Sequence, residues 1–330
     1  MKYCIKPFTS IEVDTHGDVY TCCPAFLRNN VDGTNNRIGN ILENSFDEIW
    51  YSDKAIELRK KVMNGDYSMC DLDLCRQREL RFEHEFSLSS KPEAPIDITL
   101  AYDKECNFYC ITCRDEKYKN STEMKELLNS RIKDTLMPLL KNAKKVAMSG
   151  SGELFASEHS RLLVKEITSN YPYIKFLIMT NGLLCNKTNC DALGLGKNIH
   201  EIFVSLPAIS KKIYNSIIRG GNIDIVTKNI KWLAQSQKEG LIGAVKLSCV
   251  VSSLNYREIP NLVNFAKKLG ITIIISQYYS WGTKLGEDYE NLAVWNYEHK
   301  KHKDFVKILK KYTNYDECFL QPLFQELKDN

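Results

Sequence analysis

The sequence predicts an α/β protein in which a barrel-forming segment follows a small α+β domain. After residue 95, short aliphatic and β-branched runs alternate with longer runs at helical spacing. Six such strand-and-helix units imply a parallel sheet, curled into a partial (β/α)6, TIM-like barrel. Before residue 87 the pattern changes to short strands, a turn and one helix. A chain of 330 residues is long enough for one large domain and one small domain.

Composition and charge are those of an ordinary water-soluble protein. Hydrophobic residues make up 43% of the chain and charged residues 26%, and the net charge is only +4. This charge is too small to indicate a polyanionic partner, so nucleic acid is not expected. The first ten residues carry no apolar run of signal-peptide length, and the most hydrophobic run, 271–275, is too short to span a bilayer. We therefore expect a cytoplasmic protein without a membrane partner.

The predicted first domain covers residues 1–86 and is rich in cysteine. Cys4 and Cys22 flank an expected hairpin through residues 16–18. Ser45 and Glu48 form a capping-box pattern, and apolar residues at helical spacing then predict one helix ending near residue 64. Cys70 and Cys75 follow this helix. In a reducing compartment, the twelve cysteines of the chain are better explained by metal binding or catalysis than by disulfides.

A Ser- and Pro-rich linker at 87–95 leads to the predicted barrel at 96–282 and to a helical extension at 283–330. We expect strands at 96–102, 145–149, 174–180, 199–206, 244–251 and 271–276. We expect helices at 122–140, 157–170, 223–239 and 256–269, a poorer one near Cys190, and a basic one ending near Lys311. In such barrels the chemistry lies at the carboxyl ends of the strands.

Three cysteines follow the first barrel strand. Cys106, Cys110 and Cys113 enclose three and then two residues. This spacing lets a short loop cover one face of an iron-sulfur cube, so that three thiolates hold three irons and the fourth iron keeps an open position. A structural zinc site would need a fourth ligand, and the loop contains no other Cys or His.

The run from Cys106 to Cys113 resembles the cluster-binding loop of radical S-adenosylmethionine (SAM) enzymes. The resemblance implies an oxidoreductase or maturase-type enzyme that reductively cleaves SAM. The resulting deoxyadenosyl radical would abstract a hydrogen atom from an unactivated carbon of a peptide or of an amino- or sugar-like substrate. Dehydrogenation, epimerisation and cross-linking remain open as outcomes. Flavodoxin or ferredoxin would be the reductant.

The first domain is similar to the auxiliary-cluster module called SPASM, or twitch in its shorter form. The likeness rests on the spacing of Cys4, Gly17 and Cys22. In most such enzymes the module follows the barrel, whereas here it precedes it. The resemblance implies a second [4Fe-4S] cluster, for electron transfer, held by Cys4, Cys22, Cys70 and Cys75, with Cys23 as a substitute for its neighbour. The alternative is a structural zinc, and the rival function is a zinc-stabilised binding protein that uses the basic helix for contacts.

The SAM-binding residues are expected at the ends of the next strands. Gly150 and Gly152 let the backbone approach a ligand, and family likeness assigns Glu153 to the amino group of SAM. Asn181 ends the third strand, where a turn is the alternative reading. Likeness also assigns Ser205 and Arg219 to SAM, although a solvated loop arginine is the alternative for Arg219.

The remaining candidates lie later in the barrel. If Cys249 on the fifth strand faces inward, its thiol could return a hydrogen atom to a substrate radical, but a core-filling role is favoured. Cys185, Cys190 and Cys318 are interpreted as structural. Gln277, Tyr278, Tyr279 and Trp281 leave the sixth strand at the catalytic edge, where they either shape a substrate pocket or only pack.

Overall fold

The computed structural model describes residues 4–24, 27, 36–72, 75, 89–148, 150–279 and 286–312, and the backbone of 318–320. The chain divides into two compact units. Unit 1 contains Met1–Glu105, Asn120–Gly152 and Ser157–Phe176, and unit 2 contains Cys106–Lys119, Glu153–Ala156 and Leu177–Asn330. Residue 149, Trp281 and the side chain of Cys318, which the sequence singled out, lie outside the described residues.

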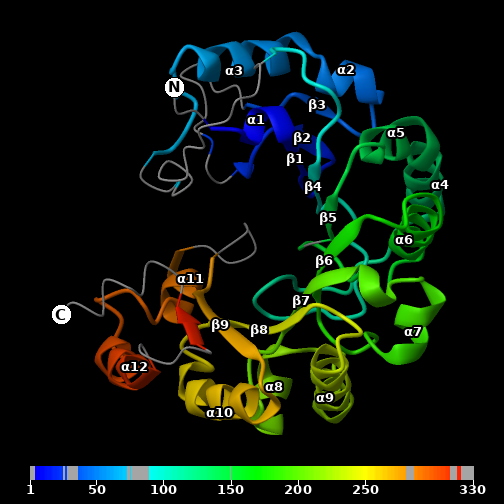
Figure 1. Ribbon diagram of the computed structural model, residues 1–330. Helices are drawn as coiled ribbons and strands as arrows, with labels where there is room; N and C mark the ends of the chain where they lie inside the picture. Colours follow the sequence, from blue (N-terminus) through cyan, green and yellow to red (C-terminus); the bar gives the residue numbers. More distant parts are fainter. Residues whose placement is uncertain are drawn as a thin grey trace. The chain divides into compact units, whose positions relative to one another are not determined.

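Unit 1 combines a short sheet with flanking helices (Figure 1). Its strands are β1 (Ser10–Val13), β2 (Asp18–Tyr20), β3 (Gly39–Asn40), β4 (Asp97–Leu100) and β5 (Lys145–Met148). Its helices are α1 (Lys6–Thr9), α2 (Phe46–Trp50), α3 (Asp53–Met63), α4 (Thr122–Arg131), a π-helical stretch (Ile132–Leu136), α5 (Met137–Leu140) and α6 (Glu158–Asn170).

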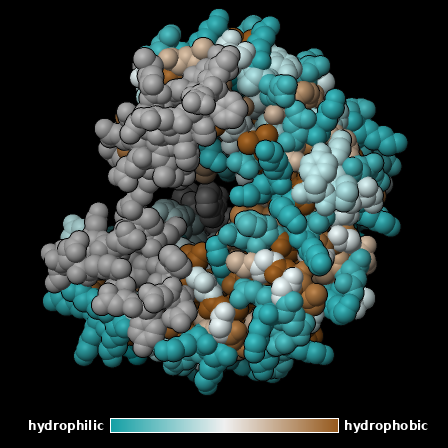
Figure 2. Space-filling view, viewed as in Figure 1, coloured by the Kyte–Doolittle hydropathy of each residue, from teal (hydrophilic) through white to brown (hydrophobic). Residues whose placement is uncertain are grey.

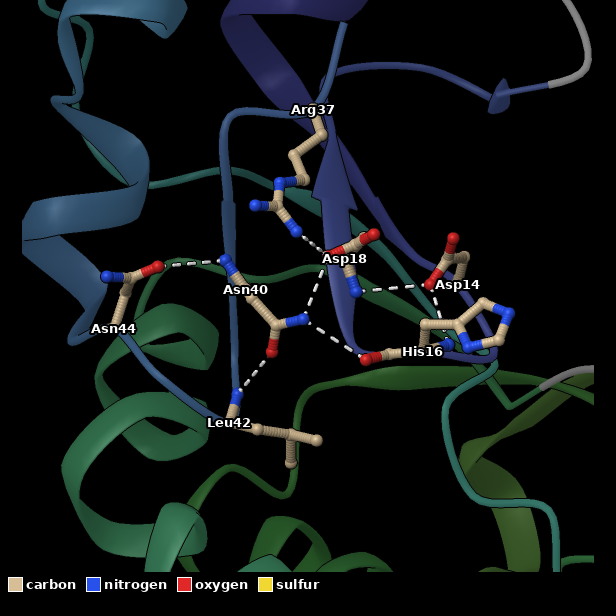
Figure 3. Close-up of polar contacts among 7 residues, drawn as sticks. All are labelled: Asp14, His16, Asp18, Arg37, Asn40, Leu42 and Asn44. Carbon is tan, nitrogen blue, oxygen red and sulfur yellow. Dashed lines mark hydrogen bonds and ion pairs between the residues drawn. The ribbon is translucent and has the colours of Figure 1, made fainter. Parts of the chain in front are cut away.

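The expected hairpin is present between β1 and β2, which pair antiparallel. Asp14 closes the turn, because its Oδ1 accepts from the backbone N–H groups of His16 at 2.8 Å and Asp18 at 3.1 Å. Figure 3 shows that Asn40 of β3 then joins the hairpin, donating from Nδ2 to Asp18 Oδ1 at 2.8 Å. Gly17 has φ +82°, a left-handed conformation that favours glycine.

The sheet of unit 1 continues from the hairpin into the predicted barrel. β1 pairs in parallel with β4, and β4 pairs in parallel with β5. The order across unit 1 is therefore β3-β2-β1-β4-β5. The first strand after the N-terminus is thus hydrogen-bonded to the first predicted barrel strand, which the sequence pattern did not indicate.

The single helix expected from residue 46 to residue 64 is wrong, because the structure has two helices there. The capping box is present: Ser45 and Glu48 satisfy each other's backbone N–H groups at the start of α2. The chain leaves helical geometry at Tyr51, with φ −108° and ψ 17°, and Ser52 caps α3 by accepting from the Ala55 N–H at 3.1 Å. A second N-cap so close to the first starts a new helix.

Helix α3 buries an arginine that the sequence did not single out. Arg59 is fully buried, lies 4.1 Å from the centroid of the Trp50 ring, and donates at 2.8 Å to the carbonyl oxygens of Pro7 and Trp50. Burial lowers the pKa of Arg59 to about 10, so the side chain stays charged at neutral pH. The guanidinium therefore joins α1, α2 and α3 from inside the unit.

Unit 2 is a parallel sheet with helices against it (Figure 1). Its strands run in the order β6 (Lys175–Thr180, of which the last four residues belong to this unit), β7 (Ile199–Ser205), β8 (Ala244–Val251), β9 (Thr272–Gln277) and β10 (Cys318–Leu320). Its helices are α7 (Lys187–Ala192), α8 (Lys211–Ile217), α9 (Ile223–Lys238), α10 (Ile259–Leu269), α11 (Gly286–Leu292) and α12 (His302–Leu309). Helix α9 packs on β8, and α10 packs on β9.

All six predicted strands are present, with bounds close to those expected. The predicted helices are present too, with the stretch 122–140 passing through a π-helical segment and the stretch 256–258 forming a 3-10 turn. Alternation along the strands explains the agreement: in β9, Ile273, Ile275 and Gln277 are buried while the residues between them are half-buried. Helix α8 and strand β10 were not expected, because they are short and lack a strong periodic pattern.

The predicted fold class is confirmed: the chain is α/β, with parallel strands in a sheet that is not closed, as in a partial TIM-like barrel. The visible face in Figure 2 is mainly hydrophilic, with hydrophobic residues in small scattered patches. Among the described residues, every helix is too short or too polar to cross a lipid bilayer. The proposed domain limits at 86, 95 and 282 stay a prediction.

Candidate functional site

The three-cysteine loop is held by the backbone that follows α8. Tyr109 donates its N–H to the carbonyl oxygen of Arg219 at 3.2 Å, and Ile111 donates to that of Ile217 at 3.0 Å. The loop then turns, with the Cys113 N–H donating to the Cys110 carbonyl at 2.9 Å. These bonds fix Tyr109 and Ile111, the residues on either side of Cys110, against residues 217–219.

The thiols of the loop influence one another's ionisation. Burial raises the pKa of Cys110 to about 12, with further contributions from the charges of Cys113 and Cys106. Burial also raises the pKa of Cys106, although its Sγ accepts a hydrogen bond from the Phe108 N–H at 3.4 Å. Cys113 is the exposed member of the trio. All three thiols are therefore close enough for the ionisation of one to affect another.

Three buried hydrogen-bond donors of the same unit have no partner among the described residues. They are Nδ2 of Asn107, inside the loop, the hydroxyl of Tyr214 on α8, and the hydroxyl of Tyr278 after β9. A buried donor without an acceptor is unfavourable by about 1–3 kcal/mol, so such groups indicate a missing acceptor. The sulfides and thiolates of an iron-sulfur cluster are acceptors of this kind, and the residues around the loop fit such a group.

The cysteines do not form a site for a single metal ion. Within the described ranges, no three His, Cys, Asp or Glu side chains are arranged to hold one ion. In a zinc site the ligands converge on one centre, whereas in an iron-sulfur cube each thiolate binds its own iron.

Glu153 is an anchor for the end of β6. Its Oε2 accepts from the Asn181 N–H at 2.7 Å, and its Oε1 accepts from the Thr180 hydroxyl at 2.8 Å and from the Phe155 N–H at 3.3 Å. The side chain is 2% exposed, and burial raises its pKa to about 7 against the lowering effect of the three hydrogen bonds. The assignment of Glu153 to the amino group of SAM stays a prediction, and the visible role of the carboxylate is to hold Thr180 and Asn181.

Asn181 connects that anchor to the cysteine loop. Its Nδ2 donates to Oδ1 of Asn107 at 2.8 Å and lies 3.9 Å from Sγ of Cys106. Its Oδ1 accepts from the Leu183 N–H at 3.1 Å, which also makes it part of a turn. The functional reading and the turn reading of Asn181 are therefore both consistent with its contacts.

The other predicted SAM residues lie at several places. Gly150 has φ +89°, and a Cβ atom there would be in ordinary contact with Ala101 Cβ at 3.8 Å. Gly152 lies so close to the Asp103 backbone that a Cβ atom would be 2.3 Å from the carbonyl oxygen. Ser205 is exposed at the end of β7. The guanidinium of Arg219 lies 5.8 Å from the centroid of the Tyr109 ring, so it is stacked near the loop. Their roles toward SAM stay predictions.

Asp103, between β4 and the cysteine loop, is a residue that sequence reasoning missed. Its carboxylate accepts from the hydroxyls of Ser157 and Ser160, the latter at 2.6 Å, and from Asn120 Nδ2 at 3.0 Å. The signal in the sequence was its place directly after a buried strand. Asp103 thus fixes the chain three residues before Cys106.

The predicted auxiliary ligands are partly gathered in unit 1. Burial raises the pKa of Cys22 to about 12, and the charges of Cys4, Cys75 and Cys23 add to the effect. Cys4 and Cys70 share a neighbour, since Tyr67 accepts from the Cys4 N–H through its hydroxyl and from the Cys70 N–H through its carbonyl. Cys23 is hydrogen-bonded to Glu12. The choice between Cys22 and Cys23 as a ligand stays open.

The remaining candidate residues are buried, with the exception of Tyr279. Cys249 on β8 is fully buried, and Asn255 Nδ2 lies 3.9 Å from its Sγ. Cys185 and Cys190 are buried beside each other, and a hydrogen bond between their thiols raises the pKa of Cys185. After β9, Tyr278 is buried and packs on aromatic residues of the C-terminal segment, with ring centroids 5.7 Å from Tyr289 and 6.4 Å from Trp295. Tyr279 is exposed.

Comparison with known proteins gives similarity over most of the chain. Residues 4–77 match the SPASM family model, described as an iron-sulfur cluster-binding domain. A probable GTP 3',8-cyclase of Methanococcus maripaludis is 21% identical over 63% of this chain and 67% of its own length. The FeMo cofactor biosynthesis protein NifB of Methanocaldococcus infernus is 26% identical over 49% of this chain and 60% of its own length. Both are radical SAM homologues.

A structural comparison gives SuiB of Streptococcus suis bound to S-adenosylmethionine, at 15% identity and a TM-score of 0.47. The match covers 85% of this chain but only 58% of that protein, so this chain spans little more than half of it. The assignment of the family rests on the SPASM match, on the curated relatives and on the three-cysteine loop. The chain is similar to radical SAM enzymes, and its residues 4–77 match the SPASM iron-sulfur cluster-binding domain.

Proposed function

We propose that the protein reductively cleaves SAM and removes a hydrogen atom from an unactivated carbon of its substrate. The observation that carries this proposal is the cysteine loop, whose three thiols lie within electrostatic range of one another and whose residues 109 and 111 are fixed by backbone hydrogen bonds. Asn107 and Tyr214 beside it have buried donors with no acceptor in the described part of the chain. Cys106, Cys110 and Cys113 would hold the cluster. When bound, the cluster supplies one electron for cleavage of SAM to methionine and, after hydrogen transfer from the substrate, 5'-deoxyadenosine.

The residues around the loop would orient the two reacting molecules. Asn181 contacts both the loop and the Glu153 anchor, so it fixes the end of β6 against Cys106. Gly150, Gly152, Ser205 and Arg219 are proposed for SAM. Tyr278 and its aromatic neighbours would exclude water from the substrate side, because their rings close together after β9. Cys249 is fully buried on β8, which fits the favoured core-filling role, and hydrogen donation to a substrate radical is the alternative for its thiol.

The substrate class that we propose is a peptide or an amino- or sugar-like molecule, with dehydrogenation, epimerisation or cross-linking as the reaction. The second cluster, held by Cys4, Cys22, Cys70 and Cys75, would exchange an electron with the substrate or with a reductant such as flavodoxin or ferredoxin. We propose a reducing, cytoplasmic compartment, in which cysteines stay available for metal binding.

The decisive experiment is anaerobic incubation with SAM and a strong reductant, with methionine and 5'-deoxyadenosine measured by chromatography. We expect cleavage by the wild type, none by Cys106→Ala, and cleavage by the control Cys190→Ala, which removes a buried thiol outside the loop. Cleavage that survives Cys106→Ala would contradict the assigned ligand. Zinc without iron or sulfide in the purified protein would contradict the function as a whole.

The auxiliary cluster is tested by its iron. Two cubes contain about eight irons per chain, and the double change Cys70→Ala with Cys75→Ala should remove about half of them. SAM cleavage should remain detectable in this variant, because the cysteine loop is intact. An unchanged iron content would contradict the auxiliary ligand set.

A further inference from the structure

Tyr214 on α8 is buried in a way that its own unit does not explain. The side chain is 1% exposed, and its hydroxyl has no hydrogen-bond partner among the described residues. A buried hydroxyl of this kind is unfavourable unless an acceptor is supplied. A phenylalanine would fill the same space without that penalty, so the hydroxyl indicates an acceptor that belongs to the functional state.

The backbone makes room for this hydroxyl. A Cβ atom on Gly221 would lie 2.6 Å from the Tyr214 oxygen and 3.0 Å from a ring carbon, closer than real side chains allow. Gly220 likewise borders the cysteine loop, because a Cβ there would be 3.0 Å from the Asn107 carbonyl oxygen. Two consecutive glycines thus let the segment after α8 approach both the phenol and the loop.

Tyr214 lies one helical turn before the backbone that holds the residues on either side of Cys110. The chain that leaves α8 accepts hydrogen bonds from Tyr109 and Ile111, which flank Cys110 in the loop. A phenol hydroxyl is protonated at neutral pH and can act as a donor to a negatively charged sulfur.

We propose that Tyr214 donates a hydrogen bond to the sulfur atoms at the Cys110 side of the SAM-cleaving cluster and thereby raises the cluster's reduction potential. This inference rests on the proposed function, since it requires a cluster on the loop. Reduction adds one negative charge to the cluster, so a fixed donor stabilises the reduced form more than the oxidised form. Tyr214 is then a positioning residue that makes the electron needed for SAM cleavage easier to load.

The test compares Tyr214→Phe with the wild type in a redox titration followed by electron paramagnetic resonance. The signal to follow is the one that changes when SAM is added, which separates this cluster from the auxiliary one. We expect the equilibrium constant for reduction to fall about tenfold, equivalent to about 59 mV for a one-electron couple. The matched control is Tyr256→Phe, whose hydroxyl donates to Asp304 Oδ2 at 2.8 Å; the potential should not change.

A second readout does not depend on the potential. In D2O, the reduced wild-type cluster should show a hyperfine coupling to an exchangeable deuteron that is lost in Tyr214→Phe and kept in Tyr256→Phe. An unchanged or more positive potential in Tyr214→Phe, or an unchanged deuteron coupling, overturns the inference. A wild type without any cluster that responds to SAM would instead overturn the proposed function, so the two failures are distinguishable.

Discussion

Replacing Glu153 by glutamine should make the relative stability of the protein depend on pH. The carboxylate is buried and its pKa is raised to about 7 from an ordinary value of 4.5. A carboxyl with a raised folded-state pKa stabilises the fold below the unfolded-state pKa, and this contribution is lost as the pH rises through about 7. Glutamine does not titrate, so the variant is spared that loss.

The magnitude follows from the two pKa values. The full difference, from 4.5 to about 7, is worth about 3 kcal/mol. Between about pH 5.5 and about pH 8.5, linkage gives a gain of about 2 kcal/mol for the variant relative to the wild type. A separate, pH-independent loss of about 1–3 kcal/mol is expected because the glutamine NH2 group cannot accept from the Asn181 N–H. The change of the stability difference with pH therefore measures the cost of the buried charge, and its pH-independent part measures the lost hydrogen bonds.

The assay is urea unfolding across this pH range, on samples with the same iron content. Glu258→Gln is the matched control, since Glu258 is also buried and accepts hydrogen bonds from Ile209, Ser210 and Asn261, but its pKa is lowered. Because the pKa of Glu258 is lowered in the folded state, its carboxyl is ionised in both the folded and the unfolded protein over this pH range. The difference in unfolding free energy between Glu258→Gln and the wild type should therefore not change with pH. A flat or opposite slope for Glu153→Gln would refute the reasoning.

Three further outcomes are expected. Burial raises the pKa of Cys110 to about 12, so the thiol must release a proton when it binds iron. Cluster loading, measured in competition with a chelator, should therefore strengthen from about pH 7 to about pH 8.5. Loading that does not change with pH would contradict thiol ligation. Gly152→Ala should lower the free energy of unfolding by about 3 kcal/mol, because its Cβ would be 2.3 Å from the Asp103 oxygen. Gly65 has φ +76° and open space around it, so Gly65→Ala should lower this free energy by only about 1 kcal/mol. Arg59→Met should lower the free energy of unfolding by about 3 kcal/mol, because it leaves the buried carbonyls of Pro7 and Trp50 unpaired. The exposed Arg257→Met should lower it by less than about 1 kcal/mol. Equal losses in urea unfolding would contradict the packing argument.

Much of the fold was predictable because its signals are local. The period-2 and helical patterns located the six strands and most helices, and the capping box at Ser45 located the start of α2. The same patterns gave one helix where Ser52 starts a second, since an apolar stripe can continue across a break between two helices. Short elements without a stripe, such as α8 and β10, carried no comparable signal.

The sequence by itself determined the chemistry of the site: three cysteines at one spacing, a glycine-rich turn after the next strand, and a second group of cysteines near the N-terminus. Only the tertiary structure decided how these parts are held. It joined β1 to β4, placed residues 217–219 along the cysteine loop and engaged both oxygens of Glu153 at the end of β6. It also buried the Tyr214 hydroxyl away from any acceptor that the described residues offer. The reason is physical: ligand spacing and periodicity are properties of neighbouring residues, whereas these contacts join residues far apart in the chain and exist only when the elements pack.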